Sequence, residues 1–198
     1  MFTGIIQSIG RIQAIEHYEG GAFVELACVN LINDLAIGDS LAVNGVCSTI
    51  KNKRESIVSI DYLSETLAKT TIGNLAVGDS VNLELAMQMN TRMGGHMIQG
   101  HVDCVGEIID LGIAKPWSSV TVSYPEKFKH LLVEKGSISL DGISLTVVDV
   151  QNTQFTCHLI EHTVENTVFS KRQKGDKVNL EFDIVGKYLY RFYSQIKD

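Results

Sequence analysis

The sequence predicts a mainly β protein made of tandem duplicated six-stranded Greek-key closed β-barrels with a short C-terminal α-helix. Three observations lead to this expectation: an internal repeat, short alternating runs of polar and apolar residues, and turn pairs between those runs. Residues 43–50 read VNGVCSTI, and residues 140–147 read LDGISLTV. Each stretch has an apolar run, an Asn-Gly or Asp-Gly pair and an alternation that reaches Thr, which is typical of a β-hairpin.

The repeat covers both halves of the chain. A shift of 97 aligns Gly45 with Gly142 and Cys47 with Ser144, and it lays 65–85 on 162–182 with eight of 21 positions identical. A shift of 96 lays GIIQSIGRI (4–12) on GHVDCVGEI (100–108), so one residue was gained or lost in between. This density of identities indicates a tandem duplication.

Within each copy, runs rich in Val, Ile, Leu, Ser and Thr predict strands. The runs are SLAVNGVCSTI, SIVSIDYL, SVNLEL, SSVTVSY, SISLDGISLTVVDV and KVNLEFDIV. Gly-Asp pairs at 38–39, 78–79 and 175–176 predict turns, and residues 64–70 and 126–134 have brief helical patterns. Small closed barrels leave no free strand edge. The expected organisation is a first barrel over 1–87, a linker carrying GGHMIQGH, a second barrel over 97–185 and a tail over 186–198.

The tail GKYLYRFYSQIKD places five apolar or aromatic residues on one helical face: Tyr188, Leu189, Phe192, Tyr193 and Ile196. A helix of two to three turns is marginal alone in water, so the stripe needs a partner. The pattern is compatible with two packing partners. The tail docks on its own barrel, or it associates with the same helix of other subunits.

Composition excludes several function classes. The net charge is −6 and the basic residues are scattered, which argues against nucleic acid as a ligand. No secretory signal opens the sequence and no apolar stretch approaches the length of a membrane span, so we expect a cytoplasmic protein with no membrane partner. The four cysteines lack C-x-x-C spacing and no H-E-x-x-H is present, so no metal site is expected.

Candidate reactive groups gather in three places. Cys47 follows a tight turn, where it is either a reactive thiol or a small core residue. His96 and His101 lie between glycines, a setting that favours acid–base work over metal binding. Ser144 lies in the second turn, with Lys135 a few residues before it. Since two related barrels provide two related pockets, the chain is equipped to hold two similar molecules.

Seven segments together resemble the riboflavin synthases of the α-chain type, in the lumazine-binding family. They are MFTGII, GDSLAVNGVCSTI, SETLAKTTIGNLAVGDSVNLE, GGHMIQGHVD, KGSISLDGISLTV, LIEHTVENT and KGDKVNLEFDI, which occur in the family's order across both halves. The resemblance implies a transferase that moves a four-carbon unit between two molecules of 6,7-dimethyl-8-ribityllumazine. The products are riboflavin and 5-amino-6-(ribitylamino)uracil. The resemblance also implies no metal or cofactor and a homotrimer joined by its C-terminal helices. Association with lumazine synthase is a further partner that the sequence leaves open.

The same resemblance implies the site residues. His101 would be the acid/base, assisted by Ser40, Cys47 and Phe2. The first pocket would contain Gly4, Ile5, Ile6, Cys47, Ser48, Thr49, Asp61, Tyr62, Leu63, Ser64, Glu65 and Thr66. The second would contain Gly100, His101, Val102, Lys135, Ser144, Leu145, Thr146, Ile160, Glu161, His162, Thr163, Val164 and Glu165.

Two residues depart from the family pattern. Ser48 stands where Leu is usual, which we expect to add a hydroxyl near the first pocket, and Glu161 stands where Pro is usual. The main alternative function is a non-catalytic lumazine- or flavin-binding antenna protein. A flavin-binding module of a larger reductase would need a nucleotide-binding partner domain, for which the sequence has no motif.

Overall fold

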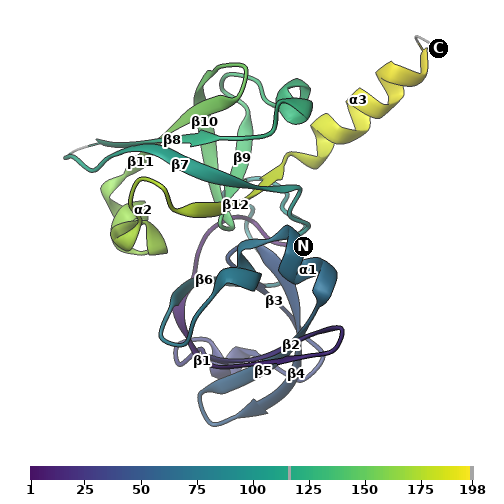
Figure 1. Ribbon diagram of the computed structural model, residues 1–198, viewed down its shortest axis with the longest axis vertical. Coiled ribbons are helices and arrows are strands. Elements are labelled where there is room, and N and C mark those ends of the chain that lie inside the picture. The colour runs from purple at the N-terminus through teal and green to yellow at the C-terminus, as the bar shows by residue number, and fades with distance from the viewer. Residues whose placement is uncertain (116, 197–198) are drawn as a thin grey trace.

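The chain folds into two closed antiparallel barrels, one above the other, with a helix that projects from the second (Figure 1). The computed structural model describes residues 1–115 and 117–196. The predicted duplicated barrels are therefore confirmed.

The first barrel has the strand order β1-β2-β5-β4-β3-β6, and β6 closes on β1. Its strands are β1 (Ser8–Tyr18), β2 (Gly21–Ala27), β3 (Ser40–Val43), β4 (Val46–Arg54), β5 (Ile57–Leu63) and β6 (Ser80–Leu85). Between β5 and β6 lie the helix α1 (Ser64–Lys69) and a 3₁₀ turn (Thr71–Asn74), and a second 3₁₀ turn (Ile32–Asp34) precedes β3.

The second barrel repeats this topology. Its strands are β7 (Cys104–Gly112), β8 (Trp117–Ser123), β9 (Ser137–Leu140), β10 (Ile143–Val150), β11 (Gln154–Ile160) and β12 (Lys177–Phe182). Its helix is α2 (Glu161–Glu165), with 3₁₀ turns at Glu126–Leu131 and Val168–Lys171. Even the bulges correspond, because the register shifts after Ile12 and Ile108 and again after Ile50 and Val147. Such bulges increase the local twist that closes a small barrel.

Each barrel encloses its own core of aliphatic and aromatic residues. One difference between the cores is a pair of hydroxyl side chains in the first barrel. In the first barrel, the Ser48 hydroxyl hydrogen-bonds the Tyr62 hydroxyl at 2.7 Å and donates to the Val46 carbonyl at 2.9 Å. The second barrel has Leu145 and Leu159 at the corresponding positions, both buried. The small Ser and large Tyr thus replace two leucines, and their hydroxyls satisfy each other.

The two repeated turns meet each other between the barrels. A Cβ on Gly45 would lie 2.6 Å from the Gly142 nitrogen, and one on Gly142 would lie 2.8 Å from the Gly45 nitrogen. Both glycines have positive φ, +76° and +83°, as a two-residue hairpin turn requires. The similar turn is therefore written twice because the two copies form the contact between barrels.

Asparagine side chains hold this contact from both sides. Asn82 donates to the Asp141 carbonyl at 3.0 Å, and Asn179 donates to the Asn44 carbonyl at 2.8 Å. The side-chain carbonyl of Asn82 accepts from the Val168 backbone, and that of Asn179 accepts from the Thr71 backbone. These four bonds satisfy buried polar groups that would otherwise disfavour the interface.

One ion pair breaks the correspondence between the turns. The Asp141 carboxylate is fully buried and accepts from Arg172 at 2.5 Å and from the Asn179 backbone at 2.8 Å. The corresponding first-barrel residues are Asn44 and Leu75. Burial raises the pKa of Asp141, and the Arg172 charge opposes that shift.

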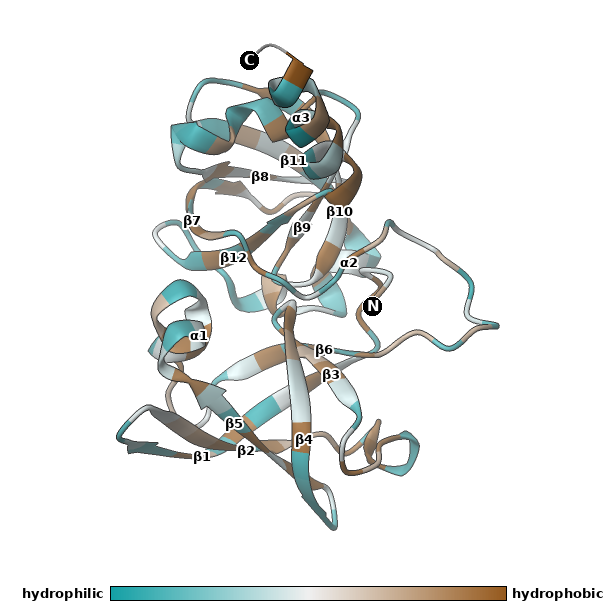
Figure 2. Cartoon of the chain, turned by 90° about the vertical axis from the view of Figure 1, so that its right-hand side faces the viewer, coloured by the Kyte–Doolittle hydropathy of each residue, from teal (hydrophilic) through white to brown (hydrophobic). Residues whose placement is uncertain are grey.

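Helix α3 (Ile184–Ile196) projects away from the second barrel (Figure 1), and brown apolar bands alternate with teal polar ones along it (Figure 2). Tyr188, Leu189, Phe192 and Ile196 are between 61% and 84% exposed. Tyr190 stacks on His130 with ring centroids 3.6 Å apart, so only part of the helix contacts the barrel. The predicted tail extends two residues beyond the described part of the chain. No helix within the described residues is long and apolar enough to span a membrane.

Candidate active site

The segments that precede β1 and β7 each cross to the opposite barrel. The Gly100 carbonyl accepts from the Cys47 backbone at 2.9 Å, and the Gly4 carbonyl accepts from the Ser144 backbone at 2.9 Å. Both glycines have φ of +80°, and a Cβ there would lie 2.6 Å from the Cys47 Cβ or 2.4 Å from the Ser144 Cβ. Glycine is therefore required for each segment to approach its partner turn.

This crossing corrects the predicted grouping of the pocket residues. The resemblance implied that residues 4–6 lie with Cys47 and residues 100–102 with Ser144. The structure does the reverse, since Val102 packs against the first core and Ile6 against the second. The grouping was wrong because each segment was assigned to the barrel whose first strand it enters.

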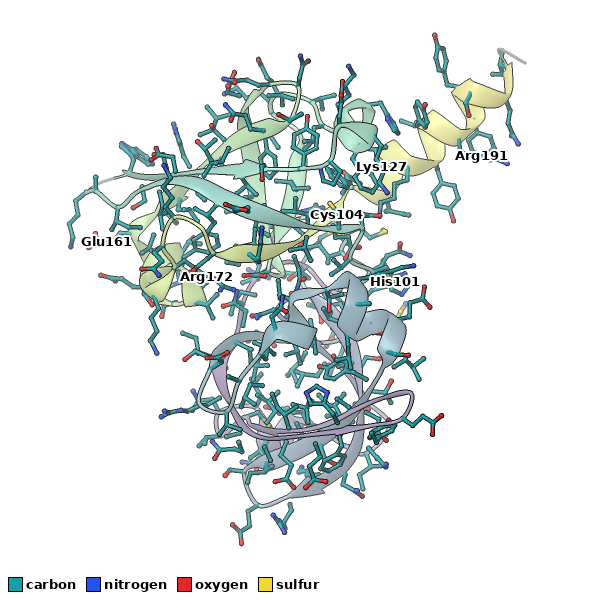
Figure 3. All side chains as sticks on the ribbon, viewed as in Figure 1. His101, Cys104, Lys127, Glu161, Arg172 and Arg191 are labelled. Atoms are coloured by element: carbon teal, nitrogen blue, oxygen red, sulfur yellow. The ribbon has the colours of Figure 1, made fainter. Side chains whose placement is uncertain are left out.

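A cavity of about 320 Å³ lies where the second crossing segment meets the first barrel. We call it the first site; its lining residues are Val46, Cys47, Glu65, Thr66, Lys69, Thr70, Gly100, His101 and Val102. Figure 3 shows His101 beside α1 at the junction of the barrels. The site brings a thiol, a hydroxyl and an imidazole to one opening.

The surroundings of the first site fix these groups. Thr70 donates to the Thr66 carbonyl at 2.7 Å and accepts from the Ile72 backbone, which ends α1 and begins the next turn. Lys69 bonds Glu65 at 2.6 Å on the rim and lowers the pKa of that carboxyl. Phe2 is fully buried in a small cluster with Ala42 and Ile98, and Cys47 packs against this cluster.

The corresponding region of the second barrel lies around Ser144, where the Gly4 carbonyl accepts from the Ser144 backbone, and we call it the second site. Ile5 and Ile6 occupy the positions of His101 and Val102 in the repeat, and Thr163 occupies that of Thr66. The two sites therefore share a plan but differ in their reactive groups.

A histidine from the linker accompanies Ser144. The His96 Nδ1 lies 2.6 Å from the Ser144 Oγ, and His96 is 9% exposed. Burial lowers the pKa of His96, while the charge of Asp183 opposes the shift. A neutral imidazole at this distance can accept the hydroxyl proton. From the sequence, His96 was named with His101 as a candidate for acid–base work, but it was not placed beside Ser144. The glycine at position 95 was the one hint in the sequence that this segment approaches another closely, because a Cβ added there would clash with Ser144.

Several predicted binding residues lie in the barrel cores instead of at the pockets. Ser48, which was expected to add a hydroxyl near the first pocket, is 2% exposed and faces Tyr62. Successive residues of a strand face opposite sides, so Ser48 points inward when Cys47 points to the site. Leu145 and Val164 are likewise core residues of the second barrel.

Other predicted residues lie at the protein surface. Asp61 pairs with Lys51 at 2.5 Å, and Glu161 pairs with Lys115, which lowers the pKa of Glu161. The remaining exposed residues are Thr49, Leu63, Ser64, Lys135, Thr146, Ile160, His162 and Glu165.

Ser40 faces a different opening from Cys47. It pairs with Thr49 in the sheet and lines a hollow of about 320 Å³ with residues that include Asp34, Asp39 and Met87. Over residues 1–115 and 117–196, no group of three or more His, Cys, Asp or Glu side chains is placed to hold a metal ion.

The fold defines a duplicated double-barrel protein in which a crossing segment meets the turn of the opposite barrel twice. Residues 3–86 and 99–183 each match the lumazine binding domain. Riboflavin synthase of Actinobacillus pleuropneumoniae is 41% identical over 192 residues, which cover 97% of this chain and 89% of that protein. Riboflavin synthase of Mycobacterium bovis is 39% identical over 195 residues, covering 96% and 97%. The chain belongs to the riboflavin synthase family.

Solved structures of LumP have the same fold. LumP complexed with 6,7-dimethyl-8-(1'-D-ribityl) lumazine superposes with a TM-score of 0.84 at 21% identity, covering 92% of this chain and 99% of that one. LumP complexed with riboflavin gives a TM-score of 0.86 over the same coverage.

Proposed function

We propose that this chain is a riboflavin synthase, a transferase that converts two 6,7-dimethyl-8-ribityllumazine molecules into riboflavin and 5-amino-6-(ribitylamino)uracil. One molecule gives up a four-carbon unit and the other accepts it. The observation that carries the proposal is the presence of two sites of one plan with different reactive groups, in a chain of this family. Two copies of one substrate in unequal roles match that arrangement.

The residues divide between the two roles as follows. In the first site, His101 moves a proton at the 7-methyl group of the lumazine, and Cys47 assists addition to the ring. In the second site, the hydroxyl of Ser144 hydrogen-bonded to His96 is the corresponding group. Holding the reactants in place can contribute about 7–11 kcal/mol to lowering the barrier. Acid–base work adds about 10²- to 10⁴-fold.

The central test is turnover without additions. The purified protein is mixed with 6,7-dimethyl-8-ribityllumazine, with no cofactor or metal, and lumazine absorbance is followed with flavin formation. We expect one riboflavin for every two lumazines consumed. Pigment that binds and persists unchanged would instead indicate an antenna protein of the LumP kind.

His101→Gln tests the acid/base assignment. We expect turnover to fall by about 10²- to 10⁴-fold while lumazine binding changes little. His17→Gln is the matched control, because His17 is exposed on β1 and lines neither site. Equal losses of turnover and binding in His101→Gln would contradict the assignment.

We also propose a cytoplasmic homotrimer joined through α3, with domain limits at 1–87, 97–185 and 186–198. The exposed apolar residues of α3 support the association.

Sedimentation should give a mass three times that of the chain, and Phe192→Ser should reduce the measured mass. A wild-type monomer would contradict the trimer. Association with lumazine synthase is tested by co-sedimentation of the two purified proteins.

A further inference from the structure

Two buried glutamates hold the crossing segments. Glu181 on β12 is 3% exposed. Its Oε1 accepts from the Gln99 backbone at 2.7 Å, and its Oε2 accepts from the Gly100 and His101 backbones at 2.8 and 2.9 Å. One carboxylate therefore binds three consecutive N–H groups, the last of which belongs to His101.

Glu84 on β6 does the same for the other segment. It is 2% exposed. Its Oε1 accepts from the Thr3 backbone at 2.6 Å and from the Thr3 hydroxyl at 2.7 Å, and its Oε2 accepts from the Gly4 backbone at 3.0 Å. Gly4 directly precedes Ile5, the counterpart of His101.

The crossing segments also contact each other and the turn strands. Phe2 and Ile98 form a bridge through two backbone bonds, and the carbonyls of Gly4 and Gly100 accept from the turn strands of the opposite barrels. Each segment is therefore fixed on one side by a glutamate of its own barrel and on the other by the turn strand of the opposite barrel. In the second segment, Gly100 donates to Glu181 and accepts from the Cys47 backbone. These two contacts fix the backbone directly before His101.

We propose that Glu181 and Glu84 are positioning residues for the two sites: Glu181 aligns His101 in the first, and Glu84 aligns Ile5 and Ile6 in the second. This inference rests on the proposed function. Neither carboxylate lines the described cavity of the first site, so each acts through the segment it binds.

The chemistry of the carboxylate explains why glutamate is needed. An ionised carboxylate only accepts hydrogen bonds and has room for three donors, and bonds to a charged acceptor are short and strong. A glutamine at the same position would turn one NH₂ group toward backbone N–H donors. It would keep the shape of the side chain but lose at least one bond to the segment.

The experiment compares Glu181→Gln with Glu84→Gln, each the matched control of the other. We expect Glu181→Gln to lower kcat by about 100-fold, because a displacement near 1 Å at the reacting groups has that effect. The pH profile of kcat should also change, because the proton-moving imidazole is displaced. Glu84→Gln should raise KM and leave the shape of that profile as in the wild type.

A second readout does not depend on turnover. The imidazole NMR signals of His101, assigned with His101→Gln, should move in Glu181→Gln and stay in place in Glu84→Gln. If the wild type makes no riboflavin, the proposed function fails, and the NMR result still decides the positioning role. If Glu181→Gln does not fold, Glu181→Asp shortens the side chain, keeps the charge and should move the same signals. Unmoved His101 signals, or equal movement in both Gln variants, would overturn the inference.

Discussion

Gly45→Ala tests the contact between the two turns. The residue has φ of +76°, and an alanine in this region costs about 1–2 kcal/mol. The new Cβ would also lie 2.6 Å from the nitrogen and 2.9 Å from the Cα of Gly142. These are backbone atoms that cannot rotate away, so the turns must separate, and overpacking of this kind costs about 1–3 kcal/mol. We expect the free energy of unfolding to fall by about 2–5 kcal/mol in all.

The matched control is Gly20→Ala. Gly20 also has positive φ, +98°, but a Cβ there would meet no atom within 4 Å. The free energy of unfolding of Gly20→Ala should therefore fall only by the backbone contribution, about 1–2 kcal/mol. Urea unfolding followed by circular dichroism measures both values, and separation of the barrels in Gly45→Ala should broaden the transition. Equal losses in the two variants would refute the inference that the turns are packed backbone to backbone.

Three further changes test other parts of the structure. Arg172→Leu leaves the carboxylate of Asp141 buried without its partner and should reduce the free energy of unfolding by about 3–5 kcal/mol. The double variant Arg172→Leu with Asp141→Asn copies the first-barrel pair and should recover most of this loss. Urea titrations in which the double variant shows no recovery would contradict the pairing. Tyr62→Phe removes the hydroxyl partner of Ser48 and should cost about 1 kcal/mol in the same assay, with no change in lumazine binding, because this pair faces the core. Burial raises the pKa of the Cys157 thiol from 9.0 to about 12. The thiol of the unfolded chain therefore loses its proton at a lower pH than that of the folded chain. The free energy of unfolding should fall as pH rises above 9, by up to about 1.4 kcal/mol per pH unit. Cys157→Ala should show a smaller decline between pH 9 and pH 10, and an unchanged decline would exclude this thiol as a contributor.

The sequence predicted those features that are encoded locally or by repetition. The Asn-Gly and Asp-Gly pairs fix two hairpins by their turn chemistry, and alternation identifies strands whose inner face is buried. The 97-residue shift then extends each assignment to the other barrel. Residues 126–134 show the limit of local pattern, since only Glu126–Leu131 forms a helical turn, of the 3₁₀ type.

The composition of each site was not predictable in the same way. Residues 4–6 and 100–102 have no pattern that says which barrel they contact, since the crossing is fixed by distant partners such as Glu84 and Glu181. The distance between His96 and Ser144, 48 positions apart, likewise depends on the path of the linker. The orientation of Ser48 could have been predicted from strand alternation, had Cys47 been assigned to the outer face first.

The crossing of the segments has an evolutionary consequence. Two identical single-barrel subunits that exchanged their N-terminal segments would form a symmetric dimer, in which every mutation appears in both sites at once. Once the two copies were joined in one polypeptide, a mutation could alter one site and spare the other. His101 and Ile5, or Cys47 and Ser144, are pairs of positions that have diverged in this way. The tandem duplication therefore allows the two sites of one chain to carry different reactive groups.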